Sequence, residues 1–242
     1  MEISVLMIGS IVIFFAAFIQ GITGFGFAVV AIPFLSLFVS LQMVVPIVGI
    51  LGIYINFYIY FRERSYIDFK EVKVLLIFII VLTPLGTYSL VMINELYLKV
   101  VTGFLVLSFG ICLWKGKSFR VKNEKAALVT VGSISGLLNG SIGMMGLPIA
   151  LYMTNQKAKK NVFRANIALL GFVVAVLTFF NYTMIGLINI EVIQYSLWLC
   201  VSLVLGSIIG VKIDKLIKQE LFLKISTIVI MLSGFFTLLF AG

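Results

Sequence analysis

The chain contains no histidine, only two cysteines and few charged residues. Asp, Glu, Lys and Arg make up 11% of its 242 residues, and apolar residues make up 62%. Soluble globular domains carry roughly 25% charged and about 45–50% apolar residues. The shortage of charge therefore excludes an ordinary soluble domain and indicates an integral membrane protein.

Cysteine and histidine are too scarce to support several kinds of chemistry. Cys112 and Cys200 both lie in apolar runs, and neither belongs to a CxxC pair. A disulfide framework, a zinc site and histidine-based catalysis are therefore poorly supported. Because the membrane segments also lack a paired acid and base, we predict no enzymatic activity, no metal and no cofactor.

The charge that is present has one dominant sign, with a net charge of +9. In a soluble protein this excess would suggest nucleic acid as a partner. In a membrane protein it follows from the preference for Lys and Arg in cytoplasmic loops. We therefore expect a lipid bilayer around this chain and no nucleic acid.

Long runs without any charged residue mark where the chain enters the membrane. A crossing helix needs about 20 apolar residues. Glycine-rich breaks and unalternating apolar runs argue against a β-barrel, so we predict an all-α protein. The charge-free runs are 3–61, 74–94, 100–114, 126–156, 165–190, 192–211 and 225–242.

The sequence contains an internal repeat. The segments 95–108 (ELYLKVVTGFLVLS) and 220–233 (ELFLKISTIVIMLS) are identical at seven of fourteen positions. Each half also carries a glycine-rich break, QGITG or NGSIG, and a proline follows each break. A tandem duplication explains both matches. The predicted parts are a first transmembrane repeat at 1–114, a cytoplasmic linker at 115–125 and a second transmembrane repeat at 126–242.

Basic residues predict the orientation of the chain. They gather in four clusters, which we place in the cytoplasm, and only Lys99 of the 18 falls outside them. The clusters are Arg62, Arg64, Lys70 and Lys73; Lys115, Lys117, Arg120, Lys122 and Lys125; Lys157, Lys159, Lys160 and Arg164; and Lys212, Lys215, Lys218 and Lys224.

The segment 126–156 lies between two of these clusters, so it must enter and leave the membrane from the same side. With a break at 139–146, its limbs of about 13 and 10 residues would rise only about 20 and 15 Å. A hydrocarbon core is about 30 Å thick, so this helical hairpin turns back inside it. By homology 3–39 is the matching hairpin; its limbs are longer, and whether it re-enters or spans stays open.

Three crossing helices follow each hairpin, and because three is odd the two repeats have opposite orientations. Both the N- and the C-terminus are then expected outside. The predicted crossings lie near 42–61, 72–93, 96–114, 162–183, 190–211 and 222–241.

Two broken hairpins that enter from opposite faces bring GITGFG and NGSIGMMG together near the bilayer midplane. Inverted-repeat transporters build their substrate sites in this way. The second limb of each hairpin begins at the break, where its free N–H groups and positive dipole end suit an anion. The same glycines are also typical of close helix packing. The predicted substrate-binding residues are Gln20, Gly21, Thr23, Gly24, Gly26, Asn139, Gly140, Ser141, Gly143 and Gly146.

Three further polar residues are candidates for lining the transport path, namely Asn56, Asn166 and Arg164. The asparagines are equally typical of ordinary hydrogen bonds between helices. Arg164 is equally typical of an arginine that reaches from a helix end to the membrane surface.

Three segments carry a family likeness: GITGFGF at 21–27 with Pro33, SGLLNGSIGMMGLP at 135–148, and FRAN at 163–166. On these segments the chain resembles the TauE/SafE family of sulfite exporters over nearly its full length. Its second break departs from the family's glycine-glycine-proline pattern. The resemblance implies a multi-pass transporter of a bacterial or archaeal inner membrane that carries sulfite, sulfonates or related small organic anions.

From the breaks and the resemblance we expect anion export by alternating access. An inside-negative potential favours anion exit by about 2.3 kcal/mol per charge per 100 mV. Coupling to protons or sodium and assembly into a homo-oligomer stay open. An anion channel of the same architecture and a non-transporting helper subunit are the alternative readings.

Overall fold

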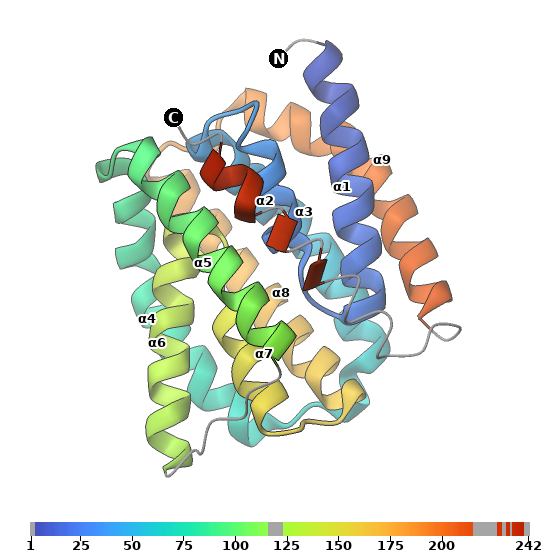
Figure 1. The fold of residues 1–242 in the computed structure, drawn as a ribbon, viewed down its shortest axis with the longest axis vertical. Helices are drawn as coiled ribbons and strands as arrows, with labels where there is room; N and C mark the ends of the chain where they lie inside the picture. The colour runs from blue at the N-terminus through green and yellow to red at the C-terminus, as the bar shows by residue number, and fades with distance from the viewer. Residues whose placement is uncertain (1–2, 116–122, 215–226, 229–230, 233, 240–242) are drawn as a thin grey trace.

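The described part of the computed structural model consists of α-helices and one short 3-10 turn (Figure 1). It covers residues 3–115, 123–214, 227–228, 231–232 and 234–239. The predicted all-α membrane protein is confirmed. The helices are α1 (Ile3–Thr23), α2 (Phe27–Leu35), α3 (Leu41–Glu63), α4 (Phe69–Met92), α5 (Glu95–Lys115), α6 (Glu124–Ile142), α7 (Gly146–Asn155), α8 (Lys160–Met184) and α9 (Ile190–Ile213), with the 3-10 turn at Arg64–Tyr66.

Six described helices are long and apolar enough to cross a membrane, namely α1, α3, α4, α5, α8 and α9. The last five lie where five of the predicted crossings were placed. Half of the sixth predicted crossing, near 222–241, falls outside the described residues. Helix α1 has 21 residues and rises about 31 Å, so it is long enough to span the hydrocarbon core.

Polar caps set where several helices begin. Asp68 precedes α4, Asn123 precedes α6 and Asn189 precedes α9, and each side-chain oxygen accepts a backbone N–H from the first turn of its helix. Such caps satisfy amide groups that have no partner within the helix. The caps fix the polar connections at the ends of the long apolar helices.

Left-handed glycines terminate the first limb of each hairpin. Helix α1 ends before Gly24, which has a φ of 80° and donates its N–H to the Gln20 carbonyl at 2.7 Å. Helix α6 ends in the same way at Gly143, with a φ of 68°. Residues other than glycine rarely adopt this conformation, so the two glycines place the chain reversals.

The first limb of the second hairpin is longer than predicted, whereas its return limb has the expected length of 10 residues. Helix α6 has 19 residues and rises about 28 Å, close to the thickness of the hydrocarbon core, whereas its expected limb had about 13 residues. The helix begins at Glu124 and continues through the polar stretch Asn139–Ile142 that was expected to be part of the break. The return limbs are the short elements: α2 has 9 residues and α7 has 10.

The two halves exchange their first helices. Helix α1 packs along α9 of the second half, and α6 packs along α4 of the first half, with the most extensive contacts in the described structure (Figure 1). Helices α3 and α8, the first after each hairpin, pack against each other at the centre. Corresponding helices of the two halves thus make corresponding contacts, as a duplicated chain requires.

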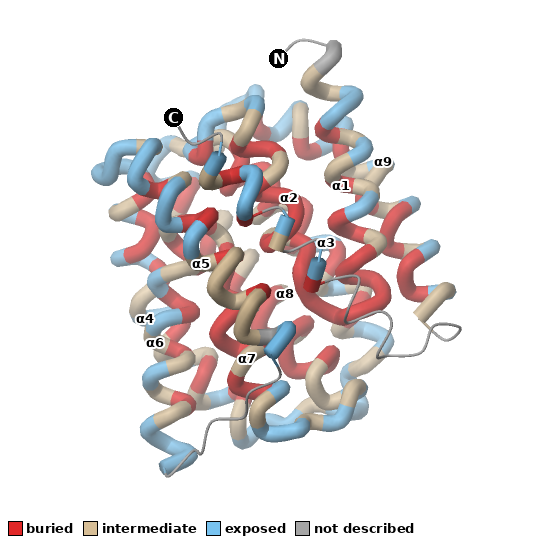
Figure 2. Tube along the Cα trace, in the orientation of Figure 1, coloured by how far each residue is buried: buried red, intermediate tan, exposed pale blue. Residues whose placement is uncertain are grey.

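Buried residues concentrate where α1, α2, α3 and α8 meet, and exposed ones lie on the outer faces of the peripheral helices (Figure 2). The outer face of α9 carries Leu197, Trp198, Val201 and Leu205, whose side chains are 53–71% exposed. A row of large apolar side chains suits contact with lipid. The start of α1 and residues 234–239 lie at one end of the molecule, and the connections at 64–68 and 156–159 lie at the other (Figure 1).

Candidate functional site

The two breaks face one cavity of about 90 Å³ in the middle of the fold. Since a water molecule needs about 10–15 Å³, the cavity has room for an ion of several atoms. Its walls come from both hairpins and from the facing helices α3 and α8. Six of the residues predicted from sequence line it: Gln20, Gly26, Asn56, Asn139, Gly143 and Gly146.

Gln20 joins three elements of the first half. Its side-chain oxygen accepts the N–H of Phe27, the first residue of α2, at 3.0 Å. Its side-chain nitrogen donates to Asn56 Oδ1 on α3 at 2.9 Å. The amide therefore holds the start of the short return limb against α1, and it places a polar pair on the cavity wall.

Asn139 occupies the corresponding place in the second half. Its side-chain nitrogen donates to Thr178 Oγ1 on α8 at 2.7 Å. The Tyr182 hydroxyl, one turn further along α8, donates to the Gly140 carbonyl at 2.9 Å. Both halves thus present a side-chain amide near the end of the first limb, bonded to the central helix that follows.

The cavity lining suits a small anion. Helices α2 and α7 begin at its edge, so their first N–H groups and positive dipole ends lie beside it. Gly146, the first residue of α7, faces open space, because a Cβ built on it would meet no atom within 4 Å. No charged side chain belongs to the lining that the structure describes. Neutral hydrogen-bond donors and helix ends would therefore bind the ion.

Gly21 and Gly140 serve close helix packing instead of lining the cavity. A Cβ on Gly21 would lie 2.8 Å from the Ser207 carbonyl oxygen of α9. A Cβ on Gly140 would lie 2.1 Å from the Thr83 carbonyl oxygen of α4. Small residues allow two membrane helices to approach until their backbones touch. The packing interpretation that the sequence left open therefore accounts for these two glycines.

Thr23, Gly24 and Ser141 also lie outside the described lining. The Thr23 hydroxyl donates to the Ile19 carbonyl at 2.7 Å and accepts the N–H of Phe25 at 3.2 Å, so it stabilises the first break. The Ser141 hydroxyl donates to the Leu137 carbonyl of its own helix at 2.8 Å. Thr23 and Gly24 therefore shape the first break, and the Ser141 hydroxyl bonds to the backbone of α6.

Arg164 and Asn166, which the sequence predicts to line the transport path, are not among the residues that line this cavity. Arg164 is 1% exposed, and its guanidinium bonds to the end of α1 and to two carboxylates. Asn166 is fully buried, and its Oδ1 accepts the N–H of Asp68 at 2.9 Å. Arg164 is therefore not an arginine that reaches out to the membrane surface. Both residues tie α8 to neighbouring helices at one end of the molecule.

Thr178 and Tyr182 are lining residues that the sequence reasoning missed. They continue a regular row on one face of α8 with Ile167, Gly171 and Ala175. The spacing of three or four residues is that of a helix face. Two polar residues on such a row within an apolar run were a usable signal. Among the described residues, no group of His, Cys, Asp or Glu side chains could hold a metal ion.

The comparison with protein families gives a match over most of the chain. The sequence model described as sulfite exporter TauE/SafE matches residues 10–237. The matched range contains both breaks, the whole cavity lining and the FRAN segment. The comparisons with curated proteins and with solved structures found no match.

Proposed function

The chain belongs to the TauE/SafE family of sulfite exporters, and from this premise we propose that it transports a small sulfur-containing or organic anion through the cavity between the two breaks. The observation that carries the proposal is the shared cavity. Gln20 with the start of α2, and Asn139 with the start of α7, reach it from different halves of the chain. A site made by both halves changes its access when the halves move against each other, as alternating access requires.

The polarity of the cavity favours an anion over a cation. Helix N-termini supply partial positive charge, and side-chain amides and hydroxyls supply donors. The described lining contributes no carboxylate, which a cation site would be expected to use. A site of neutral donors also releases its ion readily, because a buried charge of opposite sign would hold it more tightly.

Sulfite and small sulfonates fit this chemistry. Each presents three oxygens that accept hydrogen bonds, and a sulfonate adds an organic part that the apolar walls accommodate. The lining includes Phe25, Val48, Met144 and Ile167 beside its amides. The proposed direction is export, since the membrane potential favours anion exit without a coupling ion. Coupling to protons or to sodium is a further variable that the flux experiments address.

Counterflow in proteoliposomes tests the proposal. Vesicles preloaded with unlabelled sulfite, and others preloaded with a sulfonate, receive a trace of the same labelled anion outside. A carrier gives saturable uptake that the internal anion accelerates. Uptake without this acceleration would indicate a channel. Uptake no faster than in protein-free vesicles, for every anion tested, would contradict the transport proposal.

A proton or sodium gradient across the same vesicles measures coupling. A coupled carrier accumulates anion against its gradient when the coupling ion is supplied, and an uncoupled one equilibrates. Because the described lining holds no titratable carboxylate or histidine, we expect equilibration without a proton gradient. Accumulation driven by protons would contradict that expectation.

A further inference from the structure

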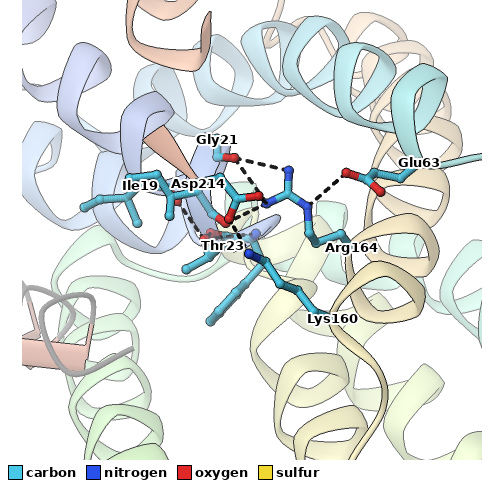
Figure 3. Close-up of polar contacts among 9 residues, drawn as sticks. Ile19, Gly21, Thr23, Glu63, Lys160, Arg164 and Asp214 are labelled. Carbon is cyan, nitrogen blue, oxygen red and sulfur yellow. Dashed lines mark hydrogen bonds and ion pairs between the residues drawn. The ribbon is translucent and has the colours of Figure 1, made fainter. Parts of the chain in front are cut away.

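A cluster of four charged side chains lies one helical turn beyond the cavity. On α8, the lining row formed by Ile167, Gly171 and Ala175 continues backwards to Arg164 and Lys160 at the same helical spacing. These two bases meet Glu63 from the end of α3 and Asp214 from the end of α9 (Figure 3). The cluster therefore occupies the end of the cavity row that points to the basic loops.

Arg164 is the centre of this cluster. Its Nη1 donates to the Ile22 carbonyl at 2.5 Å, and Nη1 and Nη2 each lie 3.2 Å from the Gly21 carbonyl (Figure 3). Its Nε lies 3.3 Å from Glu63 Oε1, and its Nη1 lies 3.6 Å from Asp214 Oδ2. The carbonyls belong to the last turn of α1, where the helix dipole is negative.

The cluster is balanced in formal charge. Lys160 Nζ lies 2.6 Å from the second oxygen of Asp214, so two bases meet two acids. A neutral cluster has little long-range attraction for anions. Its four charges instead pair with one another, and Arg164 also donates to the end of α1, between the cavity row and the basic loops.

Two of the segments that carry the family likeness fit together here. A Cβ on Gly24 would lie 2.4 Å from Arg164 Cγ, so only glycine lets the arginine lie against the end of α1. Beside it, the rings of Phe25 and Phe163 meet edge to face with centroids 5.7 Å apart. Phe25 itself lines the cavity. The first break and the FRAN segment therefore close this end of the cavity with an aromatic pair and an ion-pair cluster.

The equivalent place in the second hairpin is apolar. A Cβ on Gly143, which ends α6 as Gly24 ends α1, would meet Ile32 Cδ1 at 2.8 Å and Val45 Cγ1 at 3.4 Å. Val45 lies on α3, the helix that corresponds to α8. The two left-handed glycines that end α1 and α6 thus have different surroundings, charged at Gly24 and apolar at Gly143.

We propose that Glu63, Lys160, Arg164 and Asp214 form an ionic latch, the gate at the basic end of the cavity. The proposal rests on the transport function above. The latch joins the packed pair α1 and α9 to the packed pair α3 and α8, so movement of one pair against the other must break it. Once open, its charged groups gain water, which offsets much of the lost pairing. The equivalent place beside Gly143, with Ile32 and Val45, has no ion pair among its described contacts.

Cysteine accessibility tests the latch directly. In a background with Cys112→Ala and Cys200→Ala, Ala175→Cys places a thiol on the cavity wall. Inside-out vesicles are labelled with a membrane-impermeant maleimide, with and without Glu63→Gln or Asp214→Asn. Both changes keep the side-chain shape and remove one charge. We expect each to raise the labelling rate from the basic-loop side by on the order of tenfold, because removing one partner of a buried ion pair leaves the other charge uncompensated.

Glu95→Gln is the matched control. Glu95 pairs with Lys99 at 3.0 Å but lies away from the latch, at the start of α5. Its removal should leave the labelling rate unchanged. Equal rates in all four proteins would overturn the latch, as would a rise in the Glu95→Gln variant equal to that in the latch variants. The test uses no variant of Arg164, so its outcome does not depend on whether a protein without this buried arginine folds.

The readout separates failure of the latch from failure of the transport proposal. If counterflow is saturable in the parent protein and labelling does not respond to Glu63→Gln or Asp214→Asn, the latch is wrong and transport stands. If labelling responds while no anion gives counterflow, the latch stands and the proposed substrate class is wrong. Protection of Ala175→Cys by sulfite would further locate the anion in the cavity.

Discussion

Asn139 and Ser141 are two residues apart near the end of α6, yet they face different surroundings. The Asn139 amide lines the cavity and donates to Thr178, whereas the Ser141 hydroxyl donates to a carbonyl of its own helix. Both were expected to bind substrate because they are polar and lie in the glycine-rich break. The difference arises because positions two residues apart on a helix point about 200° apart.

Asn139→Ala should therefore raise the KM for anion counterflow by roughly 3- to 10-fold, which is the value of one hydrogen bond. The physical reason is loss of a donor from the cavity wall and loss of the partner that holds the Thr178 hydroxyl. Concentration dependence of counterflow in proteoliposomes gives the KM. Ser141→Ala is the matched control and should leave the KM within error; the reverse order of the two effects would contradict the site.

The sequence identified Gln20 and Asn139 because polar side chains beside glycines in an apolar run stand out. It could not distinguish glycines that bind from glycines that pack, since Gly21 and Gly146 look alike until the neighbouring helix is known. To identify Thr178 and Tyr182 as lining residues, one must also know that their face of α8 is turned toward the hairpins. The ion pairs of Arg164 could not be predicted, because its partners Glu63 and Asp214 are far from it in the chain.

Among the elements, the contact between α6 and α4 depends on the smallest residues. Gly136 and Gly140 lie against carbonyls of α4, and Gly86 of α4 lies against the Leu137 carbonyl of α6. The helix pair α1 and α9 repeats this arrangement with Gly206 and Gly210. Backbones in such close contact gain dispersion energy over their whole length, and one added methyl separates them.

Gly140→Ala should destabilise the protein by about 1–3 kcal/mol, the usual cost of overpacking. Its Cβ would lie 2.1 Å from the Thr83 carbonyl oxygen, a backbone atom that cannot rotate away. Thermal unfolding in detergent measures the effect as a lower Tm. Gly9→Ala on α1, whose Cβ would meet only side chains at 3.5 and 3.7 Å, should leave the Tm close to that of the parent. Equal Tm values for both variants would contradict the packing role.

Thr23→Val tests the first break as an element. Valine keeps the shape and removes the hydroxyl that bonds to Ile19 and Phe25, so the end of α1 loses its fixed geometry. We expect counterflow to fall several-fold, together with a lower Tm, because a bonded buried hydroxyl is worth about 1 kcal/mol. Thr130→Val is the control, since its hydroxyl bonds to Ala126 on an exposed face of α6. Unchanged counterflow in Thr23→Val would show that the hydroxyl does not support the break.

The crossing helices were predictable from charge-free runs, and the observed α3, α4, α5, α8 and α9 differ from the expected ranges by only a few residues. The length of α6, 19 residues, could not be predicted in this way. Its polar stretch was expected to be part of the break, but glycine and asparagine remain helical there because α4 packs against them. Its charged first turn, with Glu124 and Lys125, lies outside the charge-free run 126–156 that predicts the helix.

At the scale of the whole molecule, the exchange of α1 and α6 between the halves supports two repeats of opposite orientation. The polar connections at 64–68 and 156–159 lie at the end of the molecule away from the start of α1 (Figure 1). The basic residues near these connections predict that this end faces the cytoplasm. The latch then lies on the cytoplasmic side of the cavity.

Labelling of single cysteines measures this orientation. In the cysteine-free background, Ser65→Cys places a thiol in the 3-10 turn at the basic end, and Met184→Cys places one at the opposite end of α8. Both side chains are exposed. An impermeant maleimide applied to intact cells should label Met184→Cys alone, and applied to inside-out vesicles should label Ser65→Cys alone. Labelling of both from the same side would contradict the topology.

The central claim is that the anion occupies the cavity between the two breaks, and Gly146→Ala tests it most directly. The added methyl enters open space, so it fills part of the cavity without displacing backbone, and alanine is well tolerated in a helix. Sulfite counterflow is compared with that of Gly9→Ala, an identical change outside the lining. A loss of roughly tenfold or more in kcat/KM for Gly146→Ala alone is predicted, since one methyl group in a fitted site has this effect. Equal, parent-like counterflow in both variants would place the anion elsewhere.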